Sequence, residues 1–140
     1  MSAFEASALI GADAEQIWRI LMDPVRLAAG GLGITRLEGS IEAGERIRLW
    51  SEVSPGSAFS LRVGTFDRPH RMTWEGGMPL GLFKGLRTFT LTPEVKSIRL
   101  HVREEFRGLM APLIAKSMPD LTPSFRKFVD GVKTLAEQQS

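Results

Sequence analysis

Hydrophobic and polar residues alternate along most of the chain, which is the pattern of half-buried β-strands. Near the N-terminus the apolar side chains of Phe4, Ala6, Ala8 and Ile10 fall on one face. The same alternation returns in later segments, at residues 34–38, 46–53, 59–63, 71–75, 86–92 and 97–106. Because the turns between these segments are short enough for hairpins, the pattern predicts an antiparallel sheet.

Residues that favour turns separate the predicted strands. The sequence Ser-Pro-Gly-Ser at 54–57 predicts a turn after the strand that ends at Val53. A second turn is predicted at 93–96, between the last two strands. This turn would place Leu91 opposite Ile98 in the final hairpin.

Two segments change to the period of a helix. Asp13 predicts a helix N-cap because Gln16 follows three residues later as its capping-box partner. The helix should end at Asp23, since the residue before Pro24 is forced out of the helical conformation. A long amphipathic helix is predicted near the C-terminus, where apolar residues recur at Leu121, Phe125, Phe128, Val129, Val132, Leu135 and Ala136. A shorter helical segment at 111–118 precedes it.

The order of these elements predicts an α+β protein. One strand and a short helix come first, a meander of strands follows, and the long helix comes last. The predicted sheet has one apolar face, and the last helix carries an apolar stripe of matching length. We therefore expect the helix to lie across that face, so that both apolar surfaces are buried.

The composition is that of one globular domain, and it limits the chemistry. The chain has 140 residues, of which 43% are hydrophobic and 24% charged, so a single domain over residues 1–140 is expected. The absence of cysteine excludes disulfides, thiolate metal sites and cysteine nucleophiles. The two histidines, His70 and His101, lack a convergent set of further ligands, so no metal site is predicted. No phosphate-binding glycine motif occurs, and no cofactor is predicted.

The charge and the hydropathy bear on partners and location. The net charge is only +2, and the longest basic run is the pair Arg126 and Lys127, so no nucleic-acid partner is expected. No apolar run approaches the ~18 residues of a membrane-spanning helix, and the N-terminus lacks a signal-peptide pattern, so we expect no stable membrane insertion and a cytoplasmic location. Trp50 shares the polar face of its strand with Arg48 and Glu52, where it covers the outer sheet or contacts a second copy in a homodimer.

Three segments carry a resemblance to a known superfamily. They read DRPHRMTWEGG at residues 67–77, RTFTLTP at 87–93 and EEFRGLMAPLI at 104–114, and the predicted C-terminal helix also matches. Together they resemble the START-like helix-grip superfamily that includes polyketide cyclases and dehydrases (SRPBCC). The resemblance implies a curved antiparallel sheet that grips the C-terminal helix around an elongated apolar cavity. Its members bind lipids, sterols, hormones or polyketides, and some catalyse cyclisation or dehydration, but they share no catalytic residue.

Two charged residues fall on the apolar face of the predicted sheet. With a turn at 93–96, Arg87 pairs with Val102 and Glu104 lies diagonally next to Arg87. Charged groups on such a face are rare without a partner. Three interpretations stay open: an ion pair at the sheet edge, a polar anchor that orients a ligand, or a catalytic pair in which Glu104 carries a proton.

The segment 77–85 is unusually apolar for a loop, with Met78, Leu80, Leu82 and Phe83 between glycines. It is interpreted as a flexible flap over a cavity mouth, with the helical segment 111–118 as the opposite lip. The alternatives are a loop packed on the core and a patch covered by a partner subunit.

These expectations define a candidate ligand-binding set: Trp74, Met78, Phe83, Arg87, Phe89, Glu104, Phe106, Leu113, Phe125 and Val129. The leading hypothesis is a module that binds a small hydrophobic molecule, such as a lipid, a sterol or a polyketide, between the sheet and the last helix. A cyclase or dehydratase that uses the same cavity is the second hypothesis. A protein-interaction domain, docking through the apolar loop, is the third.

Overall fold

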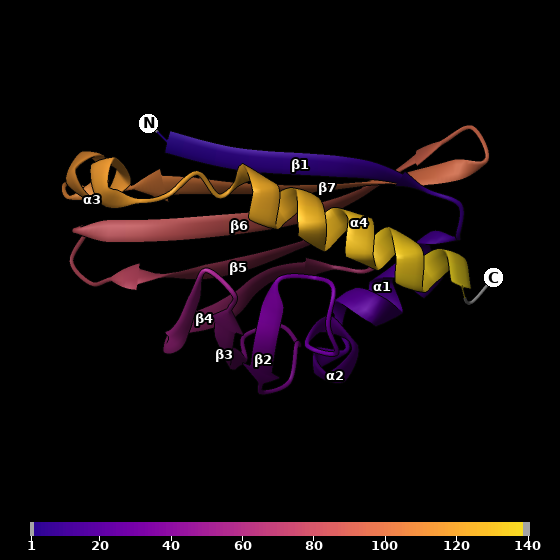
Figure 1. The fold of residues 1–140 in the computed structure, drawn as a ribbon, viewed down its shortest axis with the longest axis horizontal. Helices are drawn as coiled ribbons and strands as arrows, with labels where there is room; N and C mark the ends of the chain where they lie inside the picture. Colours follow the sequence, from indigo (N-terminus) through magenta and orange to yellow (C-terminus); the bar gives the residue numbers. More distant parts are fainter. Residues whose placement is uncertain (1, 139–140) are drawn as a thin grey trace.

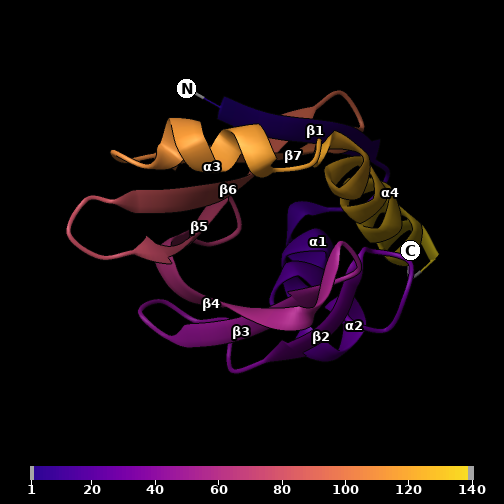
Figure 2. The same ribbon diagram turned by 60° about the vertical axis from the view of Figure 1, so that its left-hand side comes forward.

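One curled antiparallel sheet of seven strands forms the body of the computed structural model, which describes residues 2–138. The strands are β1 (Ser2–Ile10), β2 (Ile34–Glu38), β3 (Arg46–Ser51), β4 (Ser54–Asp67), β5 (Arg71–Met78), β6 (Phe83–Glu94) and β7 (Ser97–Arg107). Their order is β1-β7-β6-β5-β4-β3-β2, so the first strand pairs with the last. In Figure 2 the sheet bends at β5, with β1, β7 and β6 on one side and β4, β3 and β2 on the other.

Four helices are found among the described residues: α1 (Ala14–Leu21), α2 (Pro24–Leu27), α3 (Ala111–Ser117) and α4 (Thr122–Gln138). The long helix α4 crosses the concave side of the sheet along β1, while α1 and α2 lie near β2 (Figure 1). This arrangement confirms the predicted α+β helix-grip architecture. The capping box predicted at the start of α1 is also present, because Asp13 Oδ1 accepts the Gln16 N–H at 2.8 Å and the Gln16 side chain accepts the Asp13 N–H.

The core lies between the concave face of the sheet and α4. The apolar stripe of α4 buries Phe125, Phe128, Val129, Val132 and Ala136. Opposite them, the strands bury every second side chain, as the alternation predicts, including Phe89, Leu91, Leu100 and Val102. The period of the sequence therefore identifies which face of each strand is inside.

Polar side chains of α4 hold it along the edge strand β1. Arg126 Nη1 donates to the Ser7 carbonyl and Lys133 Nζ donates to the Leu9 carbonyl, each at 2.7 Å. These carbonyls belong to an edge strand, so the two cations satisfy backbone groups that another chain could pair with. Near the end of α4, hydrogen bonds from Lys133 and from the Gly11 N–H lower the pKa of Glu137. This contribution to stability is therefore present at neutral pH and is lost as the pH falls through the lowered pKa.

Two predicted turns are displaced in the structure. Residues 54–57 belong to β4 rather than to a turn, and β3 reverses into β4 at Glu52 and Val53. The β6–β7 hairpin turns at Val95 and Lys96, so Leu91 pairs with Leu100 instead of Ile98. This shift of two residues keeps each side chain on its predicted face but changes its neighbour across the strands.

The segment after α1 also differs from prediction. α1 ends at Leu21, two residues before Asp23, and the Asp23 side chain accepts the backbone N–H groups of Val25 and Arg26 and thereby caps α2. Pro24 fits the first turn of a helix because its missing N–H would have no partner there. The Asp-Pro sequence thus begins the second helix rather than ending the first.

Candidate ligand-binding site

A cavity of about 630 Å³ lies between the concave face of the sheet and the C-terminal part of the chain. Strands β2 to β7 and the residues just before β2 supply one wall, and α3, α4 and their connection supply the other. Most of the lining is apolar, and the aromatic part of it comprises Phe59, Trp74, Phe83, Phe89, Phe106, Phe125 and Phe128. The volume falls in the range of pockets that hold small organic ligands.

The hollow has a local cause in the sheet. Gly76 of β5 lies directly opposite Gly85 of β6, and both glycines line the cavity. The preceding position on the same face carries a large pair, Trp74 opposite Arg87. Neither glycine has a side chain to fill the concave face at this pair of positions, and the side chains of Leu61 and Phe106 lie beside them.

An ion pair crosses the floor of the cavity. Arg87 Nε donates to Glu104 Oε1 at 2.7 Å, and the two residues are direct partners in the β6–β7 register. Their side chains are only 21% and 14% exposed. The guanidinium carbon also lies 4.9 Å from the centre of the Phe125 ring, so a strand and a helix together hold Arg87 in place.

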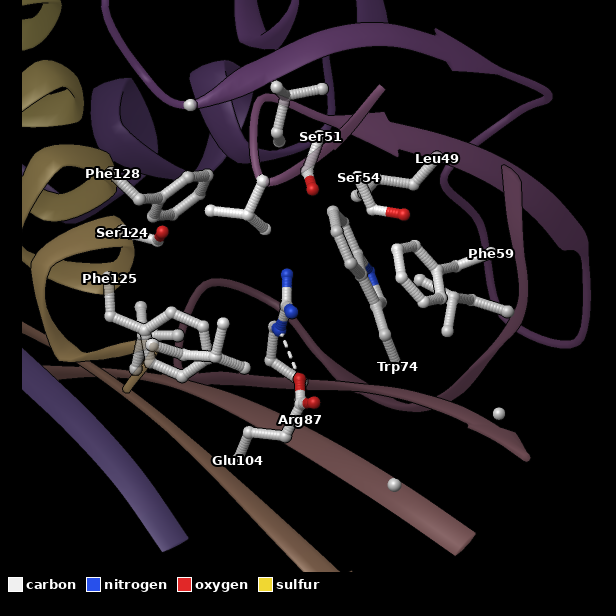
Figure 3. A pocket seen from close by; sticks show the side chains of 18 of the residues that line it. Leu49, Ser51, Ser54, Phe59, Trp74, Arg87, Glu104, Ser124, Phe125 and Phe128 are labelled. Carbon is white, nitrogen blue, oxygen red and sulfur yellow. Dashed lines mark hydrogen bonds and ion pairs between the residues drawn. The ribbon is translucent and has the colours of Figure 1, made fainter. Parts of the chain in front are cut away.

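The outer end of Arg87 remains available to a ligand. In Figure 3 its two Nη atoms point away from Glu104, into the space between Phe128, Ser51 and Trp74. Among the described residues, no hydrogen bond to either Nη atom is found. The pair therefore presents unpaired N–H groups to an otherwise apolar space.

Two further polar atoms of the lining lack partners. Ser51 Oγ and Trp74 Nε1 are buried and have no hydrogen-bond partner among residues 2–138. Buried polar groups are usually paired, and each unpaired one costs free energy. Because both atoms are buried, a ligand in the cavity reaches neither of them unless the lining moves.

The structure brings most of the predicted ligand-binding set together. The residues that line the cavity are Trp74, Phe83, Arg87, Phe89, Glu104, Phe106 and Phe125. Met78 and Leu113 do not line it; they are 46% and 65% exposed on the outside. Val129 does not line it either, because it is fully buried in the core between α4 and the sheet.

The segment 77–85 is not a loop in the structure. β5 runs to Met78 and β6 begins at Phe83, and these two residues pair, so the segment is a β-hairpin. Its tip is tied to the start of α3, because the Leu109 and Met110 N–H groups donate to the carbonyls of residues 81 and 82. Phe83 points inward and stacks on Phe106, with ring centres 5.7 Å apart. Backbone pairing thus replaces the freely moving flap that the glycines suggested.

The cavity mouth is bordered by the β3–β4 turn and by the α3–α4 connection. Val53 and Phe59, which are 54% and 47% exposed, lie on the first side, and Pro119 lies on the second. Lys127 of α4 donates to both carboxylate oxygens of Glu52 at 2.7 Å, and this ion pair joins the helix to the turn.

Four polar lining residues are absent from the predicted set: Ser51, Ser54, Ser60 and Ser124. Ser51 has the inward parity of Ile47 and Leu49, so a polar residue on an apolar face was a readable signal. Ser124, in the first turn of α4, has no such signal, because its place at the mouth depends on the path of the α3–α4 connection.

Trp50 has an intramolecular role on the convex side. Its ring is contacted by the guanidinium groups of Arg36 and Arg48, at 5.1 and 5.0 Å from the ring centre. These contacts match the first of the two interpretations of Trp50, cover for the outer sheet.

The described residues form neither a cluster of metal ligands nor a membrane-spanning helix. Within residues 2–138, no group of three or more His, Asp or Glu side chains is placed to hold a metal ion. In the same part of the chain, no helix combines the length and the apolar character needed to span a membrane.

Known proteins with the same architecture are numerous. The family described as "Polyketide cyclase / dehydrase and lipid transport" matches the chain over residues 1–137. No curated protein matches the sequence. Among solved structures, protein MLL2253 from Mesorhizobium loti is 13% identical with a TM-score of 0.76, and the alignment covers 99% of both chains. The protein TTHA0849 from Thermus thermophilus is 18% identical with a TM-score of 0.75, also over 99% of both chains.

A third similar structure is that of a protein from a biosynthetic pathway. The di-domain ARO/CYC protein BexL, from the BE-7585A biosynthetic pathway, is 14% identical with a TM-score of 0.71. The alignment covers 98% of this chain and 47% of that one. At these identities the structural likeness establishes the fold.

Proposed function

Because the chain belongs to the polyketide cyclase / dehydrase and lipid transport family, we propose that it binds one small apolar molecule, of lipid, sterol or polyketide type, in the cavity. The observation that carries the proposal is a space of about 630 Å³ that the described side chains leave open, lined by the Arg87–Glu104 pair on an otherwise uncharged wall. Removing apolar surface from water stabilises such a complex by roughly 25 cal/mol per Å². The polar pair orients the molecule.

The roles within the site follow from position. Trp74, Phe89 and Phe125 contact the apolar body of the ligand, and Arg87 binds its polar end. Phe83 and Phe106 close the cavity toward the β5–β6 hairpin. A ligand enters between the β3–β4 turn and the α3–α4 connection, where apolar side chains are exposed.

Ligand binding is testable on the purified protein. We expect native mass spectrometry, after mixing with fatty acids, sterols and aromatic polyketide mimics, to detect a one-to-one complex with at least one class. Tryptophan emission should change on binding, because Trp74 borders the cavity. No bound species from any class, together with unchanged emission, would contradict the proposal.

Chemistry in the same cavity is a second candidate function, favoured by the unpaired Nη atoms of Arg87. A guanidinium group inside an apolar space can stabilise negative charge that develops on a substrate oxygen. In that case Glu104, which is hydrogen-bonded to Arg87, carries the proton.

Turnover has a simple mass signature. If the protein catalyses dehydrative cyclisation, a bound polyketide mimic should lose one water in the wild type and remain intact in Glu104→Gln. Recovery of every mimic with unchanged mass from the wild type would favour binding alone.

A further inference from the structure

We propose that Glu104 makes the cavity select an uncharged carbonyl oxygen over a carboxylate; this inference rests on the proposed ligand binding and specifies the ligand's polar end. Its first ground is the hydrogen-bonding character of the lining. The Nη atoms of Arg87 only donate, and no hydrogen bond to either of them is found among the described residues. A ligand that satisfies them must present acceptor oxygens.

The second ground is the charge of the site. Among the described residues, Arg87 and Glu104 are the only charged members of the cavity lining, and they are hydrogen-bonded to each other at 2.7 Å. The site therefore has no net charge to attract an anion. A carboxylate at the Nη atoms would lose its hydration and would also face the carboxylate of Glu104.

A neutral carbonyl avoids both costs. Its desolvation is far less unfavourable than that of an ion, and its oxygen still accepts hydrogen bonds from a charged donor, which are the stronger kind. Phe125 contacts the face of the guanidinium and Glu104 binds its edge, so Arg87 does not need to be ordered when the ligand binds. The ion pair thus works as a fixed, electrically balanced donor.

Three probes of similar shape separate these effects: acetylnaphthalene, naphthoate and ethylnaphthalene, each substituted at the same ring position. Their binding is measured by equilibrium dialysis at neutral pH, where naphthoate is ionised. We expect the wild type to bind the ketone about tenfold more tightly than naphthoate, because the carboxylate loses more hydration and faces the Glu104 carboxylate. The ketone should also bind more tightly than the hydrocarbon.

The variant Glu104→Gln keeps the shape of the side chain and removes its charge. We expect the order of ketone and naphthoate to reverse, because Arg87 then has no counter-charge and attracts the anion. Glu105→Gln is the matched control: Glu105 is the next residue of β7, lies outside the cavity lining and pairs with Arg103 and Arg107. Its ketone preference should equal that of the wild type.

A double variant, Arg87→Met with Glu104→Met, replaces the pair by apolar side chains of similar length and leaves no charge unpaired. It should bind the ketone and the hydrocarbon equally, so the inference stays testable if Glu104→Gln does not fold.

Some results would overturn the inference alone, and others would overturn the function as well. Equal wild-type affinity for all three probes, or tighter binding of naphthoate, would overturn the charge selection while leaving cavity binding in place. An unchanged ketone preference in folded Glu104→Gln would do the same. If none of the probes binds to any variant, the inference is overturned, and native mass spectrometry with fatty acids, sterols and polyketide mimics shows whether the proposed function fails with it.

Discussion

Replacing Phe89 by alanine is expected to lower the free energy of unfolding by about 3–5 kcal/mol, the usual cost of removing a large buried aromatic side chain. Phe89 is 1% exposed and lies on the interior strand β6, between β5 and β7. Its ring is 4.6 Å from that of Trp74 and 5.8 Å from that of Phe128, so it connects the sheet to α4. Since small domains have total stabilities of about 5–15 kcal/mol, the variant should be close to unfolding at room temperature.

Urea denaturation followed by circular dichroism measures this loss. Phe59→Ala is the matched control, because Phe59 lines the same cavity but is 47% exposed. Its cost should be about 1 kcal/mol or less, since nearly half of its surface already contacts water or the open cavity. Equal losses for the two variants would mean that Phe89 does not join the sheet to the helix.

The faces of the strands could be predicted from the sequence, whereas the exact pairing could not. Alternation assigns Phe89, Arg87 and Glu104 to the concave side regardless of where the turn falls, and the structure agrees. The pairing of Arg87 with Glu104 depends on the turn, and the residues at 93–96 contain no glycine or asparagine to mark it. Lys96 adopts a φ of +60° there, a conformation that its residue type does not predict.

The cavity itself is harder to predict than the fold, for a physical reason. Aromatic residues such as Trp74 and Phe125 have the same spacing whether they fill a core or line a pocket. What distinguishes a pocket from a filled core here is the absence of side chains at Gly76 and Gly85. Only the pairing of β5 with β6 shows that these two glycines face each other. In the sequence, these glycines flank an apolar segment that is interpreted as a loop. The pairing of β5 with β6 extends beyond the alternating residues, so alternation alone does not indicate that the glycines are paired.

The exposed apolar residues of the β5–β6 hairpin illustrate the same limit. The composition of 77–85 indicates an unusual segment, but it does not say which side chains turn inward. The pairing of β5 with β6 determines which side chains turn inward. Phe83 faces the cavity and contacts Phe106, while Leu80 at the tip of the hairpin is 92% exposed. A segment that looked uniform in sequence is therefore divided between the cavity wall and the surface.

Filling the hollow from Gly85 should abolish ligand binding without unfolding the protein. A Cβ atom built at Gly85 lies 3.5 Å from the Phe106 ring and 3.7 Å from Glu104 Oε2, which are ordinary contacts, and the backbone there is normal for any residue. Gly76 is unsuitable, because its Cβ would lie 2.9 Å from the Ser60 carbonyl oxygen. In Gly85→Phe we expect the ring to occupy the space beside Arg87 where the polar end of a ligand would bind.

The stability of Gly85→Phe should equal or exceed that of the wild type, since glycine inside a strand costs roughly 0.5–1 kcal/mol relative to alanine. Gly56→Phe is the control: Gly56 also lies in a strand, has open space around its Cβ position and does not line the cavity. Native mass spectrometry and thermal unfolding of both variants separate the outcomes. If Gly85→Phe folds and still binds as the wild type does, the ligand does not occupy the space beside Arg87.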